Sequence, residues 1–195
     1  MCPALVLCFS GRMGSGKSSV TKVVADALQW QRVSFGDYVR NCVSSAGGDP
    51  ESRETLQDFG QRLATNDPDG FCRAVLQSRE FAAGANLVVD GIRHVDIYAR
   101  ISRMVAPSKA ILLYLTVDDV ELQRRIEARQ EKVLEIQRAE RHNVESDVVS
   151  SLAGMADLIV DASPPANQIA RTIIQSLSNY GLDSAIIEET LQALR

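Results

Sequence analysis

The sequence predicts an α/β fold in which a parallel sheet is covered by helices on both faces. Short apolar segments of strand length alternate along the chain with segments whose apolar residues recur at helical spacing. Such alternation is typical of a parallel sheet, because each crossover between parallel strands places a helix on one face. At 195 residues, with 45% hydrophobic and 24% charged residues, the chain has the size and composition of one globular domain.

The first strand and the first helix enclose a phosphate-binding motif. An apolar strand is expected over residues 4–9 and an amphipathic helix over residues 18–28. Between them, residues 11–18 fit G-x-x-x-x-G-K-[ST], the P-loop or Walker A motif. Its glycines let the backbone curl around a phosphate, and the loop N–H groups and the helix N-terminus attract the anion. An ordinary glycine- and serine-rich turn is the alternative, and the strand–loop–helix context disfavours it.

The residue types of this motif predict a nucleotide phosphate as its ligand. Lys17 is expected to reach the β- and γ-phosphates, and the Ser18 hydroxyl to ligate Mg²⁺. The predicted nucleotide-binding residues of the loop are Gly11, Arg12, Met13, Gly14, Ser15, Gly16, Lys17, Ser18 and Ser19.

A run of helices follows the first βα unit. Residues 30–33 predict a short strand, and Asp37 is expected to cap a helix that Tyr38 begins. Further helices are expected over residues 51–64 and 71–81, the second after a turn. This run is long for a simple βαβ crossover, so we interpret it as an insertion that forms a lid or a substrate-binding arm.

A second informative segment covers residues 87–93 and begins with an apolar strand. It delivers Asp90 at its carboxyl end, where open α/β sheets bind ligands. Asp90 is therefore expected to assist Mg²⁺ through water, and Arg93 to bind a phosphate, although a plain Asp-Gly turn is the alternative. His94 is interpreted as a helix-start residue rather than a base, before a helix over residues 96–104.

An arginine-rich segment follows the fourth predicted strand, residues 109–116. Asp118 is expected to begin a helix in this segment. One interpretation is a solvated helix in which Glu121 and Glu127 balance the charge of the arginines. Because the cluster follows a strand close to the P-loop edge, we interpret it as a mobile lid. The basic residues of the segment are Arg124, Arg125, Arg129, Lys132, Arg138 and Arg141.

The chain is expected to end with one more βα unit and a further helix. The fifth strand is predicted over residues 156–161, and the helix that follows over residues 166–177. A last helix over residues 180–195 either packs on the body of the protein or serves self-association.

Composition narrows the class of protein. The net charge of −4 gives no strong signal of nucleic-acid binding, and no apolar run approaches the ~20 residues of a membrane span. The first ten residues carry no basic segment of a signal peptide. We therefore expect a cytoplasmic protein whose cysteines are reduced thiols rather than metal ligands or disulfides: Cys2, Cys8, Cys42 and Cys72.

Over residues 4–178 the chain resembles the nucleoside monophosphate kinase group of P-loop kinases. Besides the P-loop, residues 34–40 look like the Gly-Asp-x-x-Arg start of the acceptor-binding arm. Residues 90–93 are similar to the Asp-Gly-x-x-Arg segment of adenylate kinases but are one residue shorter. Residues 53–60 are closer to dephospho-CoA kinase-like and phage deoxynucleotide kinase-like members. The arginine-rich segment lacks the zinc-ligand cysteines of adenylate kinases, so adenylate kinase itself is not expected.

The resemblance implies a three-layer fold around a five-stranded parallel sheet of order 2-3-1-4-5, in one P-loop kinase domain. It implies a helical acceptor-binding arm over about residues 36–84 and a lid over about residues 124–145, with ATP and Mg²⁺ as cofactors. The implied catalytic residues are Lys17, Asp90, Arg125, Arg129, Arg138 and Arg141. The implied ATP-binding residues, besides those of the P-loop, are Arg125, Ser163 and Pro164. The implied metal ligands are Ser18 and Asp90, and the implied acceptor-binding residues are Asp37, Arg40, Arg62 and Arg93.

The expected function is transfer of the γ-phosphoryl group of ATP to a small phosphorylated acceptor, with a (deoxy)nucleoside monophosphate favoured. A phosphate acceptor needs no strong base, whereas a hydroxyl acceptor, as in dephospho-CoA, makes Asp37 or Asp90 a candidate base. A non-kinase, ATP-binding regulatory protein is the competing class. A GTPase is disfavoured because the chain has no Asn-Lys-x-Asp, and a regulatory ATPase because Gly91 follows Asp90. The sequence leaves the oligomeric state open.

Overall fold

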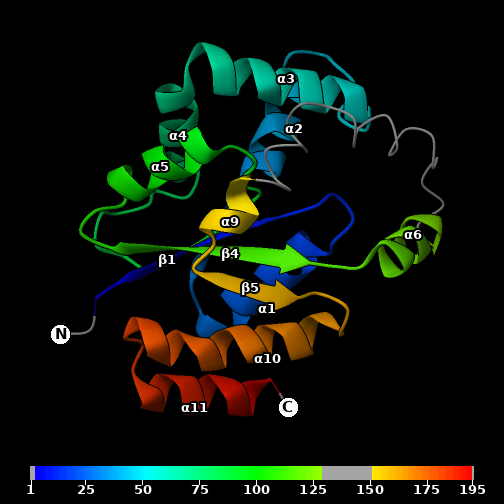
Figure 1. Ribbon diagram of the computed structural model, residues 1–195. Coiled ribbons are helices and arrows are strands. Elements are labelled where there is room, and N and C mark those ends of the chain that lie inside the picture. The colour runs from blue at the N-terminus through cyan, green and yellow to red at the C-terminus, as the bar shows by residue number, and fades with distance from the viewer. Residues whose placement is uncertain (1–2, 129–150, 195) are drawn as a thin grey trace.

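Five parallel strands form one sheet in the part of the chain that the computed structural model describes, residues 3–128 and 151–194 (Figure 1). The strands are β1 (Leu5–Gly11), β2 (Gln31–Ser34), β3 (Leu87–Asp90), β4 (Lys109–Thr116) and β5 (Leu158–Asp161). Their order across the sheet is β2-β3-β1-β4-β5. This order confirms the predicted fold class, and it puts β1 and the loop that follows it at the centre of the sheet.

Strand β1 separates two hydrophobic cores. Successive side chains of a strand point to opposite faces of the sheet. Accordingly, Leu5, Leu7 and Phe9 belong to one core, and Val6 and Cys8 belong to the other. Because both faces of β1 are buried, both sets of alternating positions must be apolar, which explains the continuous apolar run in the sequence.

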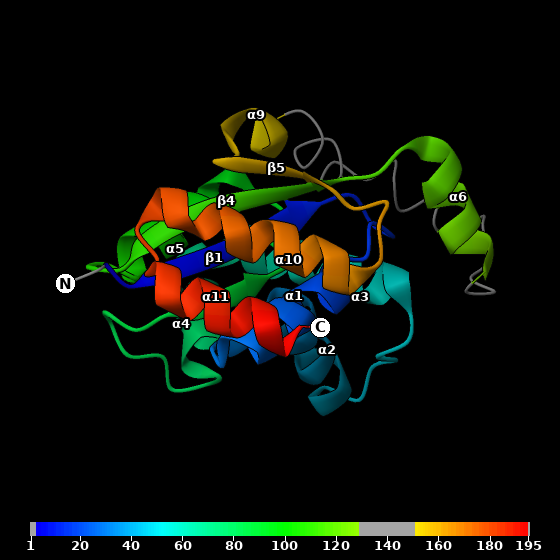
Figure 2. The same ribbon diagram turned by 90° about the horizontal axis from the view of Figure 1, so that it is seen from below.

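Helices cover both faces of the sheet, as Figures 1 and 2 show. The face that carries Leu5, Leu7 and Phe9 is covered by α1 (Lys17–Leu28), α10 (Ala166–Ser176) and α11 (Ser184–Ala193). The opposite face is covered by α2 (Phe35–Ser45), α3 (Arg53–Asn66), α4 (Pro68–Gln77) and α5 (Val95–Met104). The remaining helical elements in the described ranges are α6 (Asp119–Ala128), α9 (Ala153–Met155) and the 3₁₀ turn η2 (Leu177–Tyr180). Among these described helices, none combines the length and apolar character needed to cross a membrane.

The start of α2 differs from the sequence prediction. The helix begins at Phe35 rather than Tyr38, and its cap is Ser34 rather than Asp37. The Ser34 hydroxyl accepts a hydrogen bond from the backbone N–H of Asp37, with 3.2 Å between the two heavy atoms. Because the cap lies in β2 itself, strand and helix join without a loop, and the Asp37 side chain is left to face other groups.

Helices α4 and α11 also begin at other residues than predicted. Helix α4 starts at Pro68 inside the expected turn, because the Asp67 carboxylate caps it by accepting from the Gly70 N–H at 2.8 Å. Helix α11 starts at Ser184, after Gly181 in the left-handed conformation has capped the end of η2. It packs on the body of the protein, which was one of the two outcomes that the sequence left open.

Candidate functional site

The carboxyl ends of the parallel strands meet at one edge of the sheet, and most of the predicted site residues gather there. Gly11 ends β1, Ser34 ends β2 and Asp90 ends β3. The three strands are hydrogen-bonded neighbours, so their ends lie side by side. This is the edge at which open α/β sheets bind ligands.

The P-loop lies between β1 and α1 and requires glycine at its first position. Gly11 has a φ of 139°, and a Cβ at this position would lie 2.5 Å from the carbonyl oxygen of Leu115. At the other end of the loop, Gly16 adopts the left-handed conformation before Lys17 begins α1. The first turn of α1 contains no acidic residue. The positive end of the helix is therefore not neutralised by its own side chains, which favours an anion there.

Lys17 places a positive charge inside the curve of the loop. Its ammonium group donates hydrogen bonds to the backbone carbonyls of Gly11 and Arg12, the second at 2.7 Å. The residue is only 8% exposed. The loop thus holds a nearly buried cation beside its backbone N–H groups, where a phosphate can replace backbone carbonyls as the partner of the ammonium.

Arg125 joins α6 to the P-loop and to the segment after β5. Its guanidinium donates to the backbone carbonyls of Ser15, at 3.2 Å, and of Ser163, at 3.0 Å. Its Nε donates to the carboxylate of Glu121 at 2.7 Å. Hydrogen bonds from Arg124 and Arg125 lower the pKa of the Glu121 carboxyl to about 2. The glutamate is therefore ionised at neutral pH and orients Arg125.

This arrangement brings together several predicted ATP-binding residues. Ser163 and the following Pro164 lie in the connection between β5 and α10, which Arg125 ties to the P-loop. Arg12 of the P-loop forms an ion pair with Asp119 at the start of α6. Ser19 is exposed on α1. The predicted lid arginines that come later in the chain lie outside the described residues: Arg129, Arg138 and Arg141.

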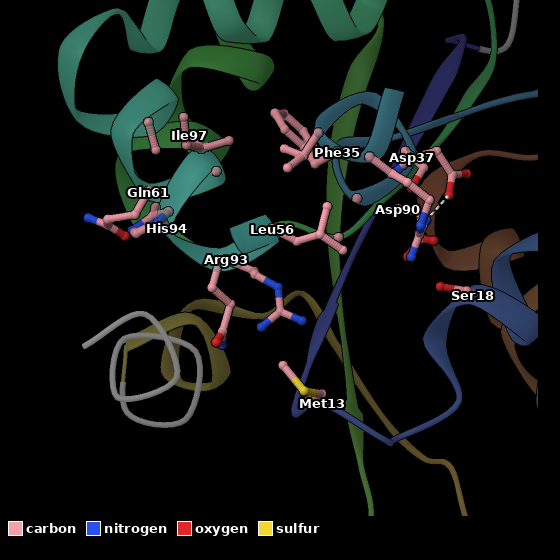
Figure 3. Close-up of a pocket in the computed structure, with 18 of the residues that line it drawn as sticks. Met13, Ser18, Phe35, Asp37, Leu56, Gln61, Asp90, Arg93, His94 and Ile97 are labelled. Carbon is pink, nitrogen blue, oxygen red and sulfur yellow. Dashed lines mark hydrogen bonds and ion pairs between the residues drawn. The ribbon is translucent and has the colours of Figure 1, made fainter. Parts of the chain in front are cut away.

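A cavity of about 280 Å³ lies between the P-loop and helices α2, α3 and α5 (Figure 3). Four cations line it among the described residues: Lys17, Arg40, Arg53 and Arg93. Its apolar wall comes chiefly from Phe35, Val39, Leu56, Phe71 and Ile97. The cavity therefore offers a strongly cationic region next to a surface on which a flat or apolar group can rest.

The cavity has two distinct ends. Figure 3 shows Ser18 and Asp90 near one another on the P-loop side, and Gln61 and His94 at the far side. Arg93 lies between these two groups in the same view. A molecule with an anionic end and a second polar end fits such a cavity lengthwise.

An arginine that was not among the predicted site residues forms ion pairs with both carboxylates that line this cavity. Arg32 of β2 forms an ion pair with Asp90, and its Nη1 lies 3.1 Å from the carboxylate of Asp37. Its Nε donates to the Thr21 hydroxyl of α1 at 2.9 Å. The Asp37 carboxylate also pairs with Arg40, at 3.3 Å. One guanidinium thus connects β2, β3, α1 and α2 around the polar end of the cavity.

The ion pair with Arg32 offsets the desolvation cost of burying the Asp90 carboxylate. The side chains of Arg32 and Asp90 are 15% and 3% exposed. A carboxylate in such a position carries a high desolvation cost unless a cation compensates it. Arg32 lies in a strand of only four residues and belongs to no motif, so only the three-dimensional pairing reveals it.

Two other arginines depart from the sequence prediction. Arg53 on α3 lines the cavity and approaches the sulfur of Met13 in the P-loop to 3.1 Å, although it was not among the predicted site residues. Arg62 is not among the described residues that line this cavity. Its guanidinium lies 5.4 Å from the ring centre of Phe59, so its predicted contact with an acceptor stays a prediction.

The predicted Mg²⁺ ligands, Ser18 and Asp90, both line the cavity. In the described part of the chain, no cluster of three or more His, Cys, Asp or Glu side chains could hold a metal ion by itself. Mg²⁺ at nucleotide sites usually takes one or two protein oxygens and completes its shell with phosphate oxygens and water. A hydroxyl and a carboxylate at the mouth of a phosphate loop fit an ion that arrives with a nucleotide.

Comparison with known proteins gives one family match and one partial relative. The family model described as "AAA domain" matches residues 7–165. A cytidylate kinase of Methanocella arvoryzae (strain DSM 22066 / NBRC 105507 / MRE50) is 38% identical over 64 residues. That stretch covers 33% of this chain and 33% of the cytidylate kinase, so the chain spans about one third of this curated relative.

Two solved structures share the fold over nearly their full length. A gluconokinase from Sinorhizobium meliloti 1021 superposes with a TM-score of 0.57 at 17% identity, covering 92% of this chain and 93% of that one. A shikimate kinase from Bacteroides thetaiotaomicron superposes with a TM-score of 0.52 at 16% identity, covering 98% and 96%. Together with the AAA domain match, these likenesses confirm the predicted resemblance to P-loop kinases in fold.

We predict that replacing Arg32 by Met will lower the free energy of unfolding by about 3 kcal/mol, because it leaves the Asp90 carboxylate buried without a partner. The double variant Arg32→Met with Asp90→Asn should regain part of this loss, since it removes the buried charge. Urea denaturation of the wild type, both single variants and the double variant measures the coupling. Losses that simply add, or an Arg32→Met variant as stable as the wild type, would contradict this account of the pair.

Proposed function

Because the chain belongs to the AAA domain family whose model matches residues 7–165, we propose that it is a P-loop kinase that uses Mg²⁺ and ATP. The acceptor that we propose is a small phosphorylated molecule, first of all a (deoxy)nucleoside monophosphate. One observation carries this proposal: a single cavity is lined both by the P-loop residues Lys17 and Ser18 and by the arginines Arg40 and Arg93. Two anion-binding groups that face one cavity are what phosphoryl transfer between two phosphates requires.

The donor side rests on the P-loop. Its backbone N–H groups and the α1 N-terminus would hold the β- and γ-phosphates of ATP, and Lys17 would neutralise the charge that develops during transfer. Ser18 and Asp90 would hold Mg²⁺, which when bound supplies further charge neutralisation between the β- and γ-phosphates. Arg125, through Ser163, would keep the adenine-side segment close to the loop.

The acceptor side rests on the arm formed by α2, α3 and α4, within the proposed range of about residues 36–84. Arg40 and Arg93 would bind the acceptor's phosphate, with Arg53 as a third cation at the same cavity. An oxygen of that phosphate would attack the γ-phosphorus of ATP in line with the leaving ADP oxygen. Because a phosphate oxygen is already ionised, this step needs positioning rather than a strong base. Asp37, held between Arg32 and Arg40, would fix the orientation of Arg40.

A hydroxyl acceptor is the second candidate, and the position of two carboxylates favours it. Asp37 and Asp90 both line the cavity, so either could accept the proton of an attacking hydroxyl, as in a dephospho-CoA kinase-like enzyme. The neighbouring fold types include a gluconokinase and a shikimate kinase. Both carboxylates are, however, ion-paired with Arg32, which occupies oxygen atoms that would have to accept the proton. We therefore place the phosphate acceptor first, and an ATP-binding regulatory protein without transfer activity last.

The lid remains a proposal at about residues 124–145. Of the arginines that we assign to it, Arg125 is held by the P-loop carbonyl of Ser15 and by Glu121. Arg129, Arg138 and Arg141 would close over the transferring group and exclude water.

We predict that Lys17→Ala will lower kcat for ADP release by about 100-fold or more, because the variant loses a charge that stabilises the transition state. A coupled assay of ADP release with ribo- and deoxyribonucleoside monophosphates, dephospho-CoA, gluconate and shikimate measures this and identifies the acceptor. The far-UV circular dichroism of the variant should match that of the wild type. Unchanged transfer by a folded Lys17→Ala protein would refute the P-loop mechanism.

We predict that Arg40→Gln will raise KM for the phosphorylated acceptor by about tenfold or more while KM for ATP changes little, because a charge-assisted contact to the acceptor is lost. The matched control is Arg73→Gln, an exposed position on α4 that does not line the cavity. Steady-state kinetics with each substrate varied in turn separates the two KM values. Equal rises in both KM values would argue against an acceptor-binding role for Arg40.

A further inference from the structure

The cavity to which we assign the acceptor's phosphate also carries an exposed carboxylate. Asp37 lines this cavity together with Arg40 and Arg93, and its side chain is 56% exposed. A carboxylate about 4 Å from a bound phosphate would weaken binding by roughly tenfold through charge repulsion. A cavity that contains Asp37 therefore binds an anion tightly only if the charge of this side chain is compensated.

Asp37 also competes with an anionic ligand for Arg40. The Nη1 atom of Arg40 lies 3.3 Å from Oδ1 of Asp37, and the Arg40 side chain is 47% exposed. Ion pairs exposed to this extent are weak, so a phosphate with up to about two negative charges can replace the carboxylate. A carboxylate with no second cation would hold Arg40 more strongly. The readiness of Arg40 to bind a ligand thus depends on the other partner of Asp37.

That partner is Arg32, which approaches Asp37 from outside the cavity. Its Nη1 lies 3.1 Å from Oδ2 of Asp37, so the two arginines contact different oxygens of one carboxylate. Arg32 is only 15% exposed and is not among the described residues that line the cavity. It therefore compensates the charge of Asp37 without occupying space that a ligand needs.

The Arg32 guanidinium is fixed at each of its three nitrogens. Besides the contact to Asp37, its Nη2 pairs with Asp90 and its Nε donates to the Thr21 hydroxyl at 2.9 Å. The Thr21 hydroxyl donates in turn to the backbone carbonyl of Ser18 at 3.1 Å. Figure 3 shows Asp37, Asp90 and Ser18 on the same side of the cavity. A planar fork of donors can contact both carboxylates at once, which a single ammonium group cannot do.

We propose that Arg32 is a positioning residue for the acceptor: it neutralises Asp37 from outside the cavity and thereby leaves Arg40 available to the acceptor's phosphate. This inference rests on the proposed function and adds a residue to it that does not touch the ligand. Arg32 then has two separate roles, since it supports acceptor binding through Asp37 and the stability of the fold through the buried Asp90. Because the two roles act through different carboxylates, a second substitution can separate them.

The variant Arg32→Met leaves the Asp37 carboxylate without its second cation. We expect it to weaken binding of the acceptor monophosphate by about tenfold, as one uncompensated charge near the phosphate predicts. Adding Asp37→Asn should restore most of this loss, because it removes the charge and keeps a side-chain oxygen for Arg40. The double variant should stay as unstable as Arg32→Met, since Asp90 still lacks its cation. The control Arg73→Met removes a positive charge at an exposed position on α4 away from the cavity, and should bind as the wild type does.

A second pair of variants makes the test independent of whether Arg32→Met folds. Arg32→Lys keeps a cation beside the buried Asp90 carboxylate but cannot contact Asp37 at the same time. We expect it to be more stable than Arg32→Met and still to bind the acceptor monophosphate several-fold more weakly than the wild type. Arg32→Lys combined with Asp37→Asn should regain acceptor binding.

The measurement is calorimetric titration of AMP, CMP, GMP, UMP and their deoxy forms into the full chain saturated with Mg²⁺ and a non-hydrolysable ATP analogue. Because the analogue occupies the P-loop, the titration reports the acceptor side, and urea denaturation of each variant reports stability. Acceptor binding that returns while stability does not supports the proposal, because a purely structural role of Arg32 would move both together.

Three results would overturn the proposal. The first is acceptor binding by Arg32→Met and Arg32→Lys that equals that of the wild type. The second is weak binding that Asp37→Asn does not relieve, and the third is an effect of Asp37→Asn that is the same with and without Arg32. Failure of every monophosphate to bind to the wild type would instead defeat the proposed acceptor class, on which the inference rests.

Discussion

The buried ion pair between Arg32 and Asp90 is the interaction on which the geometry of the site depends. Asp90 ends β3 next to the P-loop, almost out of contact with solvent, and Arg32 compensates its charge. The same guanidinium reaches Thr21 on α1 and Asp37 on α2. The helix that carries the P-loop and the helix that opens the arm are thereby held at fixed positions relative to one strand end. A transfer site that works by positioning needs this kind of fixed frame.

Under the proposed function one cavity holds two anionic ligands, and the charges that line it suit this arrangement. Lys17 sits in the P-loop, whereas Arg40 and Arg93 come from the arm side of the same cavity. Asp37 pairs with Arg40, and Asp90 pairs with Arg32, which is not among the cations that line the cavity. Because both carboxylates also line the cavity, its lining is not uniformly positive. Beyond the cations, the apolar wall extends the cavity away from the P-loop toward Gln61 and His94.

Local patterns in the sequence were enough to predict the strands of a parallel sheet and the P-loop, whereas the order of the strands came from the resemblance to P-loop kinases. Strand β4 has the predicted bounds, because its apolar run is long and buried on both faces. The cap of α2 was predicted at Asp37 rather than Ser34, since both residue types favour capping and only the backbone geometry decides between them. Arg32 and Arg53 belong to no motif, and their roles come from pairing across elements far apart in the sequence.

Under the proposed function, donor and acceptor bind together in one cavity, face to face. A bisubstrate ligand, in which adenosine and the preferred acceptor nucleoside are joined by a chain of phosphates, tests it most directly. We predict that this ligand will inhibit ADP release competitively against both ATP and the acceptor, and will bind more tightly than either substrate alone, because it spans the P-loop and the arginines of the arm. Competition with ATP alone, at an affinity no higher than that of ATP, would contradict the two-substrate site.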